Sequence, residues 1–219
     1  MRITQRSGLG AVAVAVGDAL RRHGIKAVLS GGACASLYTR GAFQSADMDF
    51  ILTGPAKRSQ LDAAMATLGF TRKGDRYMRS RTRFYVEFPR GPLAIGNDTD
   101  IRPVTRRTPH GWAVMLSPTD SCRDRLAAFY HWNDRQSLQV AVWIVLRGRV
   151  HLPAVRRWSV AEGFADRFEE FLAEVKRARA RRKPRATYAP TTWGSGRGPP
   201  WWRPRRGRPC GTCRPGAGG

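Results

Sequence analysis

Two aspartates, Asp47 and Asp49, stand two positions apart in a short apolar stretch from about Ala46 to Leu52. The stretch predicts a strand, on which the two carboxylates share one face while their neighbours point the other way. Two ionised acids side by side repel each other, and a half-buried strand rarely holds them without a cation. Mg²⁺ binds through one or two carboxylates and substrate phosphates, so the pair predicts a magnesium site that could also take Mn²⁺. The competing interpretation is a solvated strand face, on which such pairs are common.

A serine and two glycines precede this strand. Ala27, Val28 and Leu29 predict a first strand, which leads into Ser30-Gly31-Gly32 and then a helical turn of small residues. Glycines let backbone N–H groups approach a phosphate chain at the N-terminus of a helix. The three residues are therefore predicted to bind phosphate, and the alternative is a plain tight turn.

Together the segments S-G-G-A-C-A-S-L-Y and S-A-D-M-D-F resemble the polymerase-beta-like nucleotidyltransferase superfamily. More narrowly, they look like AbiEii-type nucleotidyltransferases, which are often the toxins of toxin–antitoxin pairs. The resemblance implies that Asp47 and Asp49 hold the metal and that Ser30, Gly31, Gly32 and Ser45 bind the nucleotide.

The resemblance also implies a third acid on a later strand. Phe84, Val86 and Phe88 alternate with Tyr85 and Glu87, which predicts a half-buried strand. If this strand pairs with the aspartate strand, Glu87 points to the same face and becomes the third metal ligand or the general base. The family often has Asp there, and an outward Glu is also common on strands for solubility.

A polar segment further on, D-R-L-A-A-F-Y-H-W-N-D-R-Q, is similar to helical-domain segments of these enzymes. By this similarity we predict that four of its residues face the nucleotide, and arginine suits a triphosphate because its planar fork donates two hydrogen bonds. The four residues are Asp124, Arg125, Asp134 and Arg135. The alternative is a set of surface ion pairs, which we favour for Arg123. His131 and Trp132 could stack on a base or lie in the core.

The resemblance implies a reaction and partners. The predicted enzyme is a Mg²⁺-dependent nucleotidyltransferase that moves NMP from an NTP substrate to a hydroxyl of an RNA (tRNA-like) or protein acceptor. It would serve as the toxin of a toxin–antitoxin or phage-defence pair, with an antitoxin as partner. The alternative is a non-catalytic, basic nucleic-acid-binding module.

The charge of the chain is compatible with both functions. Its 219 residues carry a net charge of +23, and Lys176–Gly219 contributes 13 Lys and Arg without an acid. The body up to Val175 therefore has 26 Lys and Arg against 16 acids, a net charge of +10. Basic charge favours phosphate-bearing partners but does not identify them.

Cysteines and hydropathy indicate the compartment. Four scattered cysteines are too few for a disulfide scaffold, which favours a reducing cytosol. No apolar run approaches the length that spans a membrane. We therefore expect a cytoplasmic protein without a membrane partner.

Periodicity predicts an α+β fold in which a small mixed-sheet domain is followed by a helical domain and a disordered basic tail. The boundaries are 1–116, 117–178 and 179–219. The first domain begins with a helix from Leu9 that Gly24 ends, and includes a second helix near 61–68 that Gly69 ends. A loop-rich segment at 89–110 and a strand at 111–116 close this domain.

The helical domain is predicted to begin at a capping box. Ser117-Pro118-Thr119-Asp120 has the pattern of a helix start, and a second helix follows at about 134–146. Ser159 and Glu162 predict another capping box before the last helix. Beyond this helix the composition is Arg, Pro, Gly and Trp, which predicts disorder. Cys210 and Cys213 lack the second ligand pair that zinc needs, so no zinc site is predicted.

Overall fold

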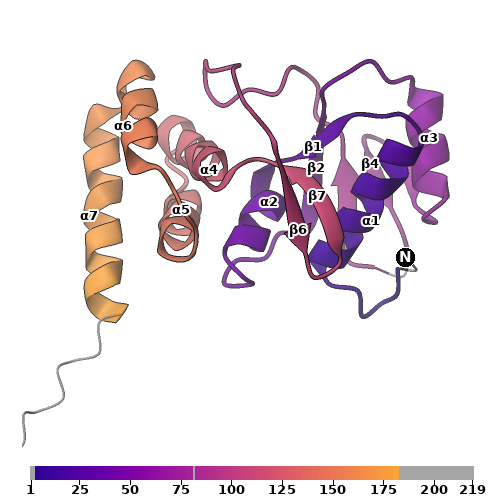
Figure 1. Ribbon diagram of the computed structural model, residues 1–219, viewed down its shortest axis with the longest axis horizontal. Coiled ribbons are helices and arrows are strands. Elements are labelled where there is room, and N and C mark those ends of the chain that lie inside the picture. Colours follow the sequence, from indigo (N-terminus) through magenta and orange to yellow (C-terminus); the bar gives the residue numbers. More distant parts are fainter. Residues whose placement is uncertain (1–2, 81, 183–219) are drawn as a thin grey trace, which may run out of the picture. The chain divides into compact units, whose positions relative to one another are not determined.

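The computed structural model describes residues 3–80 and 82–182, and the residues up to Arg182 form one unit of packed elements. The predicted basic tail begins at 179, but residues 179–182 belong to the last helix; the rest of the tail, with its two cysteines, lies outside the described residues. The expected α+β class is confirmed, because a mixed sheet with three helices is followed by four more helices in the described chain (Figure 1). None of the helices in these ranges is both long and apolar enough to cross a bilayer.

A mixed sheet is the framework of the first half of the chain. Its strands within the described ranges are β1 (Ala27–Leu29), β2 (Asp47–Leu52), β3 (Thr71–Lys73), β4 (Arg76–Met78), β5 (Tyr85–Glu87), β6 (Val104–Thr108) and β7 (Gly111–Met115). They follow the order β3-β4-β5-β2-β1-β7-β6. β2 runs parallel to β5, β1 runs parallel to β7, and the other neighbours are antiparallel.

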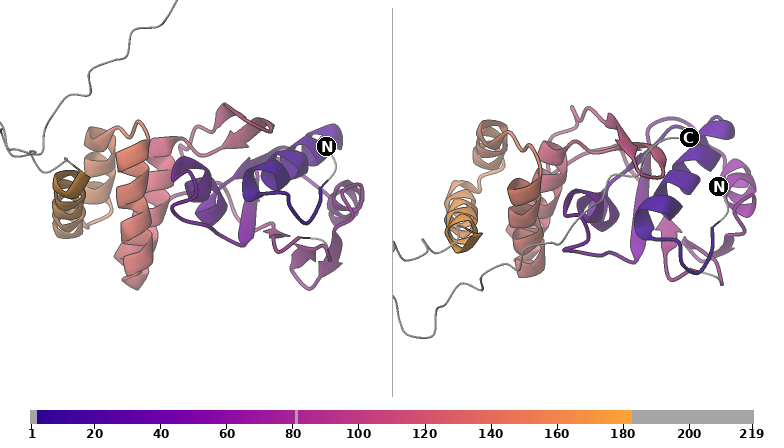
Figure 2. Two further views of the ribbon diagram at one scale, coloured as in Figure 1. Left: turned by 90° about the horizontal axis from the view of Figure 1, so that it is seen from below. Right: turned by 60° about the horizontal axis from the view of Figure 1, so that its bottom comes forward.

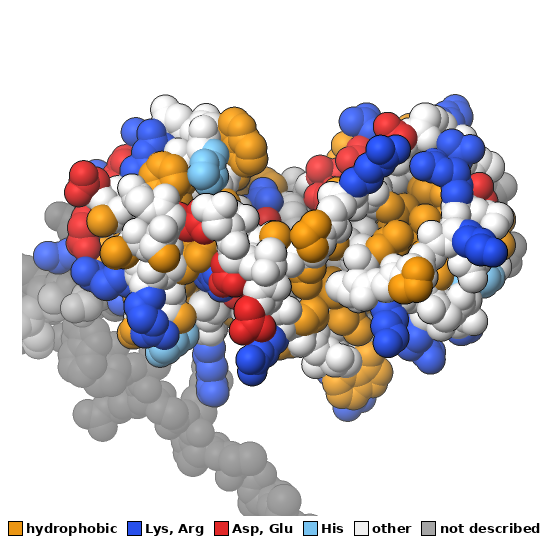
Figure 3. Space-filling model, turned by 90° about the horizontal axis from the view of Figure 1, so that it is seen from above, with side chains coloured by type: hydrophobic (Ala, Val, Ile, Leu, Met, Phe, Trp, Pro, Cys, Tyr) orange, Lys and Arg blue, Asp and Glu red, His pale blue; other side chains and the backbone are white. Residues whose placement is uncertain are grey.

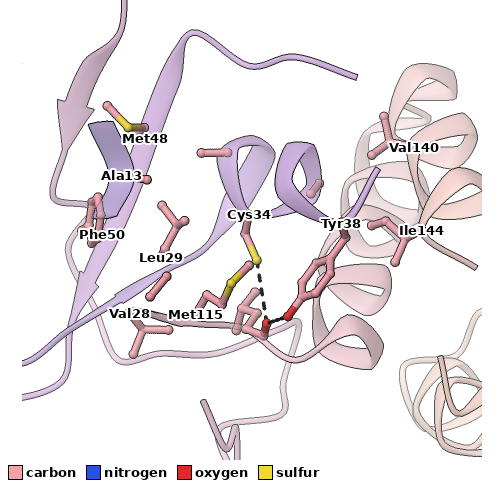
Figure 4. Close-up of a cluster of buried hydrophobic side chains, with 14 of the residues drawn as sticks. Ala13, Val28, Leu29, Cys34, Tyr38, Met48, Phe50, Met115, Val140 and Ile144 are labelled. Carbon is pink, nitrogen blue, oxygen red and sulfur yellow. Dashed lines mark hydrogen bonds between the residues drawn. The ribbon is translucent and has the colours of Figure 1, made fainter. Parts of the chain in front are cut away.

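Three helices belong to this half: α1 (Leu9–Arg22), α2 (Gly31–Tyr38) and α3 (Arg58–Ala66). α1 ends as predicted at Gly24, where φ is +71° and the Ile25 amide donates back to the Leu20 carbonyl over 2.9 Å. α2 is short and almost entirely buried, because it is made of small side chains that let it approach the sheet closely. Tyr38 at its end donates a hydrogen bond of 2.6 Å to the Leu116 carbonyl within the buried cluster of Figure 4.

The second half consists of α4 (Pro118–Trp132), α5 (Arg135–Arg147), α6 (Leu152–Ala161) and α7 (Ala165–Arg182). Ser117 caps α4 as predicted, since its hydroxyl accepts from the Asp120 amide over 3.0 Å. α4 and α5 pack against each other and against α2, and α7 packs on α5 and α6 (Figure 2). These contacts bring one end of α4 towards the sheet.

Two sequence predictions about elements are wrong. The segment at 89–110 contains β6, which pairs with β7 over five residues. Its sequence V-T-R-R-T carries little apolar signal because the strand lies at the sheet edge and is mostly exposed. The capping box at Ser159 is also wrong: Ser159 is buried inside α6, donates to the Val155 carbonyl and bonds Tyr130, and α7 begins at Ala165.

Candidate active site

Strand pairing brings the predicted third acid to the aspartate strand. In the parallel pair of β2 and β5, Asp47 is opposite Tyr85 and Asp49 is opposite Glu87. Register partners point to the same side of a sheet, so Asp47, Asp49 and Glu87 share one face. This arrangement follows from the parity of Glu87 and from the pairing of two strands whose register partners are 38 positions apart in the chain (47 and 85). The Tyr85 amide also donates to the Ala46 carbonyl over 3.1 Å, just before the paired residues.

Asp49 is the acid of this face whose pKa is raised by its surroundings. The pKa of its carboxyl is raised from the usual 3.8 to about 6, first by burial and then by the neighbouring charges of Asp47, Glu87 and Asp124, in that order. Arg125 acts in the opposite direction. Within the described residues the Asp49 side chain has no hydrogen-bond donor of its own. A cation at this point would therefore relieve repulsion that the protein leaves largely unbalanced.

The two flanking acids have partners. The Ser45 hydroxyl donates a short hydrogen bond to the Asp47 carboxylate. Arg76 on β4 donates from Nε to Glu87 Oε1 over 2.7 Å. The charge of Glu87 is thus already matched by an arginine, which distinguishes it from Asp49.

Arg76 was not among the residues singled out from the sequence. It reaches Glu87 because β4 pairs with β5 in antiparallel register, with Arg76 opposite Glu87. The turn residues Gly74 and Asp75 between β3 and β4 are the signal that predicts such a hairpin. Pairing of this hairpin with β5 could not be inferred from the local sequence.

Gly31 and Gly32 are required because the start of α2 lies very close to the β2 aspartates and to Ser45. Gly31 has φ of +60°, and a Cβ there would overlap the Asp49 carboxylate. A Cβ on Gly32 would lie 2.6 Å from Ser45 Oγ. The Ser30 amide donates to the Asp49 carbonyl over 2.9 Å, which fixes the first turn of α2 beside β2. Both glycines therefore allow the helix start to touch the acidic face, as no larger residue would.

The N-terminus of α2 is not capped by a side chain. Ser30 is its N-cap residue, but its side chain does not accept a hydrogen bond from the first turn. The first N–H groups of a helix have no partners within the helix and favour anions. Gly31 and Gly32 thus offer N–H donors next to the acids, whereas the Ser30 amide is bonded to the Asp49 carbonyl.

The helical half contributes an ion pair to the same place. Arg125 on α4 donates from Nη2 to Asp124 Oδ2 over 2.7 Å and from Nε over 3.0 Å. Burial alone would lower the pKa of Arg125, but Asp124 and Asp49 together hold it above its usual value. Asp124 and Arg125, both predicted to bind nucleotide, therefore lie within electrostatic range of Asp49.

The other two residues predicted from this segment, Asp134 and Arg135, make contacts that hold the helices. Asp134 is the N-cap of α5 and accepts from the Gln136 and Ser137 amides at 2.9 and 3.1 Å. Its pKa lies below the usual value: burial opposes this shift, but the hydrogen bonds from Ser137 and Gln136 outweigh it. Arg135 pairs with Glu170 of α7 and lies over the Phe129 ring at 5.3 Å.

The two aromatic residues at the end of α4 differ in environment. Trp132 is 77% exposed and so lies outside the core. The His131 ring meets Phe164 edge-on at 5.0 Å between centroids. Neither residue is among the groups that influence Asp49. Arg123 forms ion pairs, as favoured from the sequence, with Asp98 and Asp120, but it is buried and not part of a surface set.

The donor set suits a hard cation such as Mg²⁺ or Mn²⁺, because carboxylate oxygens are the ligands that these ions prefer. Asp47 and Asp49 supply them, and Gly31 lets the start of α2 lie directly against the Asp49 carboxylate, because a Cβ there would overlap it. Among residues 3–80 and 82–182, no three His, Cys, Asp or Glu side chains converge as a ready-made metal cage. The fit is therefore to an ion that takes its remaining ligands from water and a substrate.

Comparison with known proteins gives fold likenesses at low identity. No family model matches the chain, and no curated protein matches it. Among solved structures it is similar to an antigenic nucleotidyltransferase-like protein from Paracoccidioides brasiliensis, with 14% identity, a TM-score of 0.46, and 63% of this chain and 75% of that chain covered.

It is also similar to the antibiotic-resistance factor ANT(2'')-Ia in solution, with 12% identity, a TM-score of 0.43, and 79% of this chain and 97% of that chain covered. A crystal structure of ANT(2'')-Ia in complex with adenylyl-2''-tobramycin aligns with a TM-score of 0.41 at 11% identity, over 78% of this chain and 99% of that chain. At these TM-scores the likenesses are too distant to assign a function. The narrower AbiEii-type resemblance receives no support from them and stays a prediction.

Proposed function

We propose that the protein is a Mg²⁺-dependent nucleotidyltransferase that transfers NMP from an NTP to a hydroxyl of an RNA or protein acceptor. The observation that supports this most directly is the contact of Gly31 with the Asp49 carboxylate. It places a helix N-terminus without a side-chain cap, which suits phosphate, beside a pair of acids, which suits a metal ion. A triphosphate carrying a divalent cation needs both features at one place.

The proposed reaction is an in-line displacement at the α-phosphorus of the NTP. The acceptor oxygen forms a bond to this phosphorus, the bond to the oxygen that bridges to the β-phosphate breaks, and pyrophosphate leaves. The hydroxyl proton passes to a carboxylate base. When bound, Mg²⁺ neutralises the developing charge on the phosphate oxygens.

The residues of the chain have distinct parts in this proposal. Asp47, oriented by Ser45, and Asp49 hold the cation, and the amides of Gly31 and Gly32, with the Ser30 hydroxyl, hold the phosphates. Arg125 offsets the negative charge around Asp49 and forms an ion pair with Asp124 beside it. Glu87 is the candidate base, and its ion pair with Arg76 fixes where its carboxylate points.

The toxin role and an antitoxin partner follow only from the resemblance of the motifs to AbiEii-type enzymes. We propose them on that ground, together with a cytoplasmic site of action.

A non-catalytic nucleic-acid-binding module is the second candidate, because the net charge of +23 favours a polyanionic partner. Lys and Arg side chains are spread over the face drawn in Figure 3. Such a module would bind RNA without divalent metal and lose affinity steeply with salt. The function of such a module would not require Asp49 to lie among other acids whose repulsion is only partly compensated.

Transfer of label from α-phosphorus-labelled NTPs to total RNA and to protein tests the proposal, with each nucleotide in turn. We expect labelling by the wild type to fall by about 100-fold or more in Asp47→Asn/Asp49→Asn, because both metal ligands are lost. Asp18→Asn is the matched control, since Asp18 is an exposed acid on α1 that pairs only with Arg21. The labelled class of molecule would name the acceptor.

Absence of label from the wild type under every condition would overturn the transferase proposal. RNA binding that persists in EDTA and is unchanged by the two aspartate substitutions would then support the binding module.

A further inference from the structure

Three neighbouring strands carry a row of charged side chains across the sheet. Asp49 on β2 is the register partner of Glu87 on β5, and Glu87 is in turn the register partner of Arg76 on β4. Register partners point to the same side of a sheet, so Arg76 lies on the acidic face beside Glu87. The row therefore ends in a cation that belongs to the protein itself.

The backbone of Arg76 is fixed from both sides. β3 and β4 form a tight hairpin in which Lys73 pairs with Arg76 across the two turn residues Gly74 and Asp75. Gly74 has φ of +61°, a value that suits glycine and the turns that join antiparallel strands. On its other side, β4 pairs with β5. Because two strands hold β4, Arg76 has a defined position on the acidic face.

The Arg76 side chain makes two contacts on this face. Its Nε donates to Glu87 Oε1 over 2.7 Å, and its guanidinium lies over the Tyr85 ring, 4.8 Å from the centroid. Tyr85 is the register partner of Asp47, so the guanidinium extends from the row of Asp49 towards that of Asp47. Burial raises the pKa of Tyr85, as does the charge of Asp47, whereas Arg76 opposes this shift. The charges of Arg76 and Asp47 therefore act on the same phenol.

Part of the guanidinium is left for a ligand. Within residues 3–80 and 82–182, Arg76 donates a hydrogen bond from Nε alone, so its two Nη groups have no protein acceptor there. The side chain is 56% exposed, so these groups are accessible. The planar fork of a guanidinium matches the oxygens of a phosphate. Arg76 can thus receive a phosphate that enters the site.

The contact with Arg76 also limits what Glu87 can hold. Two-metal sites place their ions about 3.5–4 Å apart, and a second ion here would need Glu87 in addition to the aspartates. In the described ranges no three acidic, His or Cys side chains converge so as to hold a metal ion, and Glu87 instead meets Arg76. A second divalent ion at Glu87 would have to displace the guanidinium or lie beside a charge of its own sign.

We propose that Arg76 takes the place of a second metal ion, so that the site holds one divalent cation, on Asp47 and Asp49. Its Nη groups supply the second positive charge that two-metal sites place on the phosphate oxygens. Glu87 positions Arg76 through Oε1 and does not bind metal. Its Oε2 accepts from no donor in the described chain and stays available for the hydroxyl proton.

This inference rests on the proposed nucleotidyl transfer and deepens it by assigning Arg76 and Glu87. The chemical step is unchanged. The new content is the number of metal ions and the residue that replaces one of them.

The test counts the Mn²⁺ ions bound to the full-length protein. Mn²⁺ is added with the α,β-methylene analogue of each NTP in turn, equimolar to the protein, and bound Mn²⁺ is measured from the loss of the EPR signal of the free ion. We expect one ion per chain in the wild type and two in Arg76→Gln, because Glu87 then lacks its partner. Arg76→Gln/Glu87→Gln should bind one again, since the carboxylate for the second ion is absent.

Two further variants serve as controls. Arg72→Gln removes an arginine of the same hairpin, which pairs with Asp62 over 3.4 Å. The register partner of Arg72 is Tyr77, the chain neighbour of Arg76, so Arg72 points to the opposite face of the sheet. Arg76→Lys keeps the positive charge on the acidic face. Both variants should bind one ion.

The EPR spectrum of the bound ions is a readout that does not depend on the count. A lone Mn²⁺ gives the hyperfine pattern of an isolated ion, whereas two ions about 3.5–4 Å apart are magnetically coupled and lose it. We expect the isolated pattern in the wild type and in both controls, and the coupled spectrum in Arg76→Gln.

Two coupled ions in the wild type would overturn the inference while leaving the transferase intact, and this count decides whichever variants fold. A single ion in an Arg76→Gln protein that melts like the wild type would also overturn it. Absence of Mn²⁺ binding by the wild type, or binding that is unchanged in Asp47→Asn/Asp49→Asn, would instead contradict the proposed function itself.

Discussion

Asp49 is a carboxylate that the fold holds at an energetic cost. Its pKa of about 6 results first from burial and then from Asp47, Glu87 and Asp124, with Arg125 as the opposing charge. Because this pKa lies above the usual 3.8, the folded protein binds the proton more tightly than the unfolded chain does. The contribution of Asp49 to the free energy of unfolding therefore falls as pH rises from about 4 to about 6.

We predict that Asp49→Asn stabilises the metal-free protein at pH 7, because it removes a charge that costs about 1–2 kcal/mol after solvent screening. The melting temperature should rise by roughly 2–6 °C at pH 7. At pH 4, where Asp49 is protonated, the difference should vanish. Melting curves of both proteins between pH 4 and pH 7 measure this.

Magnesium supplies the control for this prediction. Mg²⁺ should raise the melting temperature of the wild type at pH 7 and leave that of Asp49→Asn unchanged, because a ligand that binds only the folded state stabilises it. A variant that is less stable than the wild type at every pH would show that Asp49 is not strained as described.

At the scale of elements, the start of α2 is the feature on which the site depends. The helix can lie against β2 only because Gly31 and Gly32 have no side chains. Gly31 combines two constraints, a positive φ and a close approach to Asp49, whereas Gly24 at the end of α1 has a positive φ with open space around it. A comparison of the two glycines therefore separates the effect of backbone strain from the effect of crowding against Asp49.

We predict that Gly31→Ala is more damaging than Gly24→Ala. Gly24→Ala should cost about 1–2 kcal/mol through its left-handed backbone alone. Gly31→Ala should cost more and abolish Mg²⁺–NTP binding, because the new methyl group displaces the Asp49 carboxylate. Urea unfolding and titration with a fluorescent nucleotide measure the two effects. Equal losses of stability with unchanged nucleotide binding would argue against the contact.

Several elements show what local sequence can predict. The cap at Ser117, the end of α1 at Gly24 and the strand that carries Asp47 and Asp49 were all predictable, because each depends on residues within one turn or a few positions. β6 was not, since its exposed edge residues have no apolar alternation. The Ser159 prediction failed because a buried serine can satisfy its hydroxyl inside a helix by donating to a carbonyl four residues back.

At the scale of the whole molecule, Arg123 links three distant parts of the chain. It is buried on α4, pairs with Asp98 from the segment after β5 and with Asp120, and lies over the Trp158 ring of α6 at 5.1 Å. Asn97 in the same segment donates to Glu162 at the end of α6. Long segments are thus fixed to the helices by charge as well as by apolar contact.

We predict that Arg123→Ala lowers the free energy of unfolding by about 3–5 kcal/mol, because it leaves partly buried acids without a partner. Arg21→Ala is the control: its exposed pair with Asp18 should be worth less than about 1 kcal/mol. Urea unfolding of both variants measures the difference. Similar losses for the two would show that the Arg123 network does not hold the segments together.

The sequence by itself determined which candidate groups lie together locally: two carboxylates on one strand, a glycine pair before them, and the parity of Glu87. These depend on local periodicity, which fixes the face to which a side chain points. The tertiary structure alone decided which of the predicted groups meet. It brought Asp124 and Arg125 to Asp49, used Asp134 as a helix cap, and matched Glu87 with Arg76. Strand order and helix packing are set by contacts between residues far apart in the chain, and local patterns do not encode them.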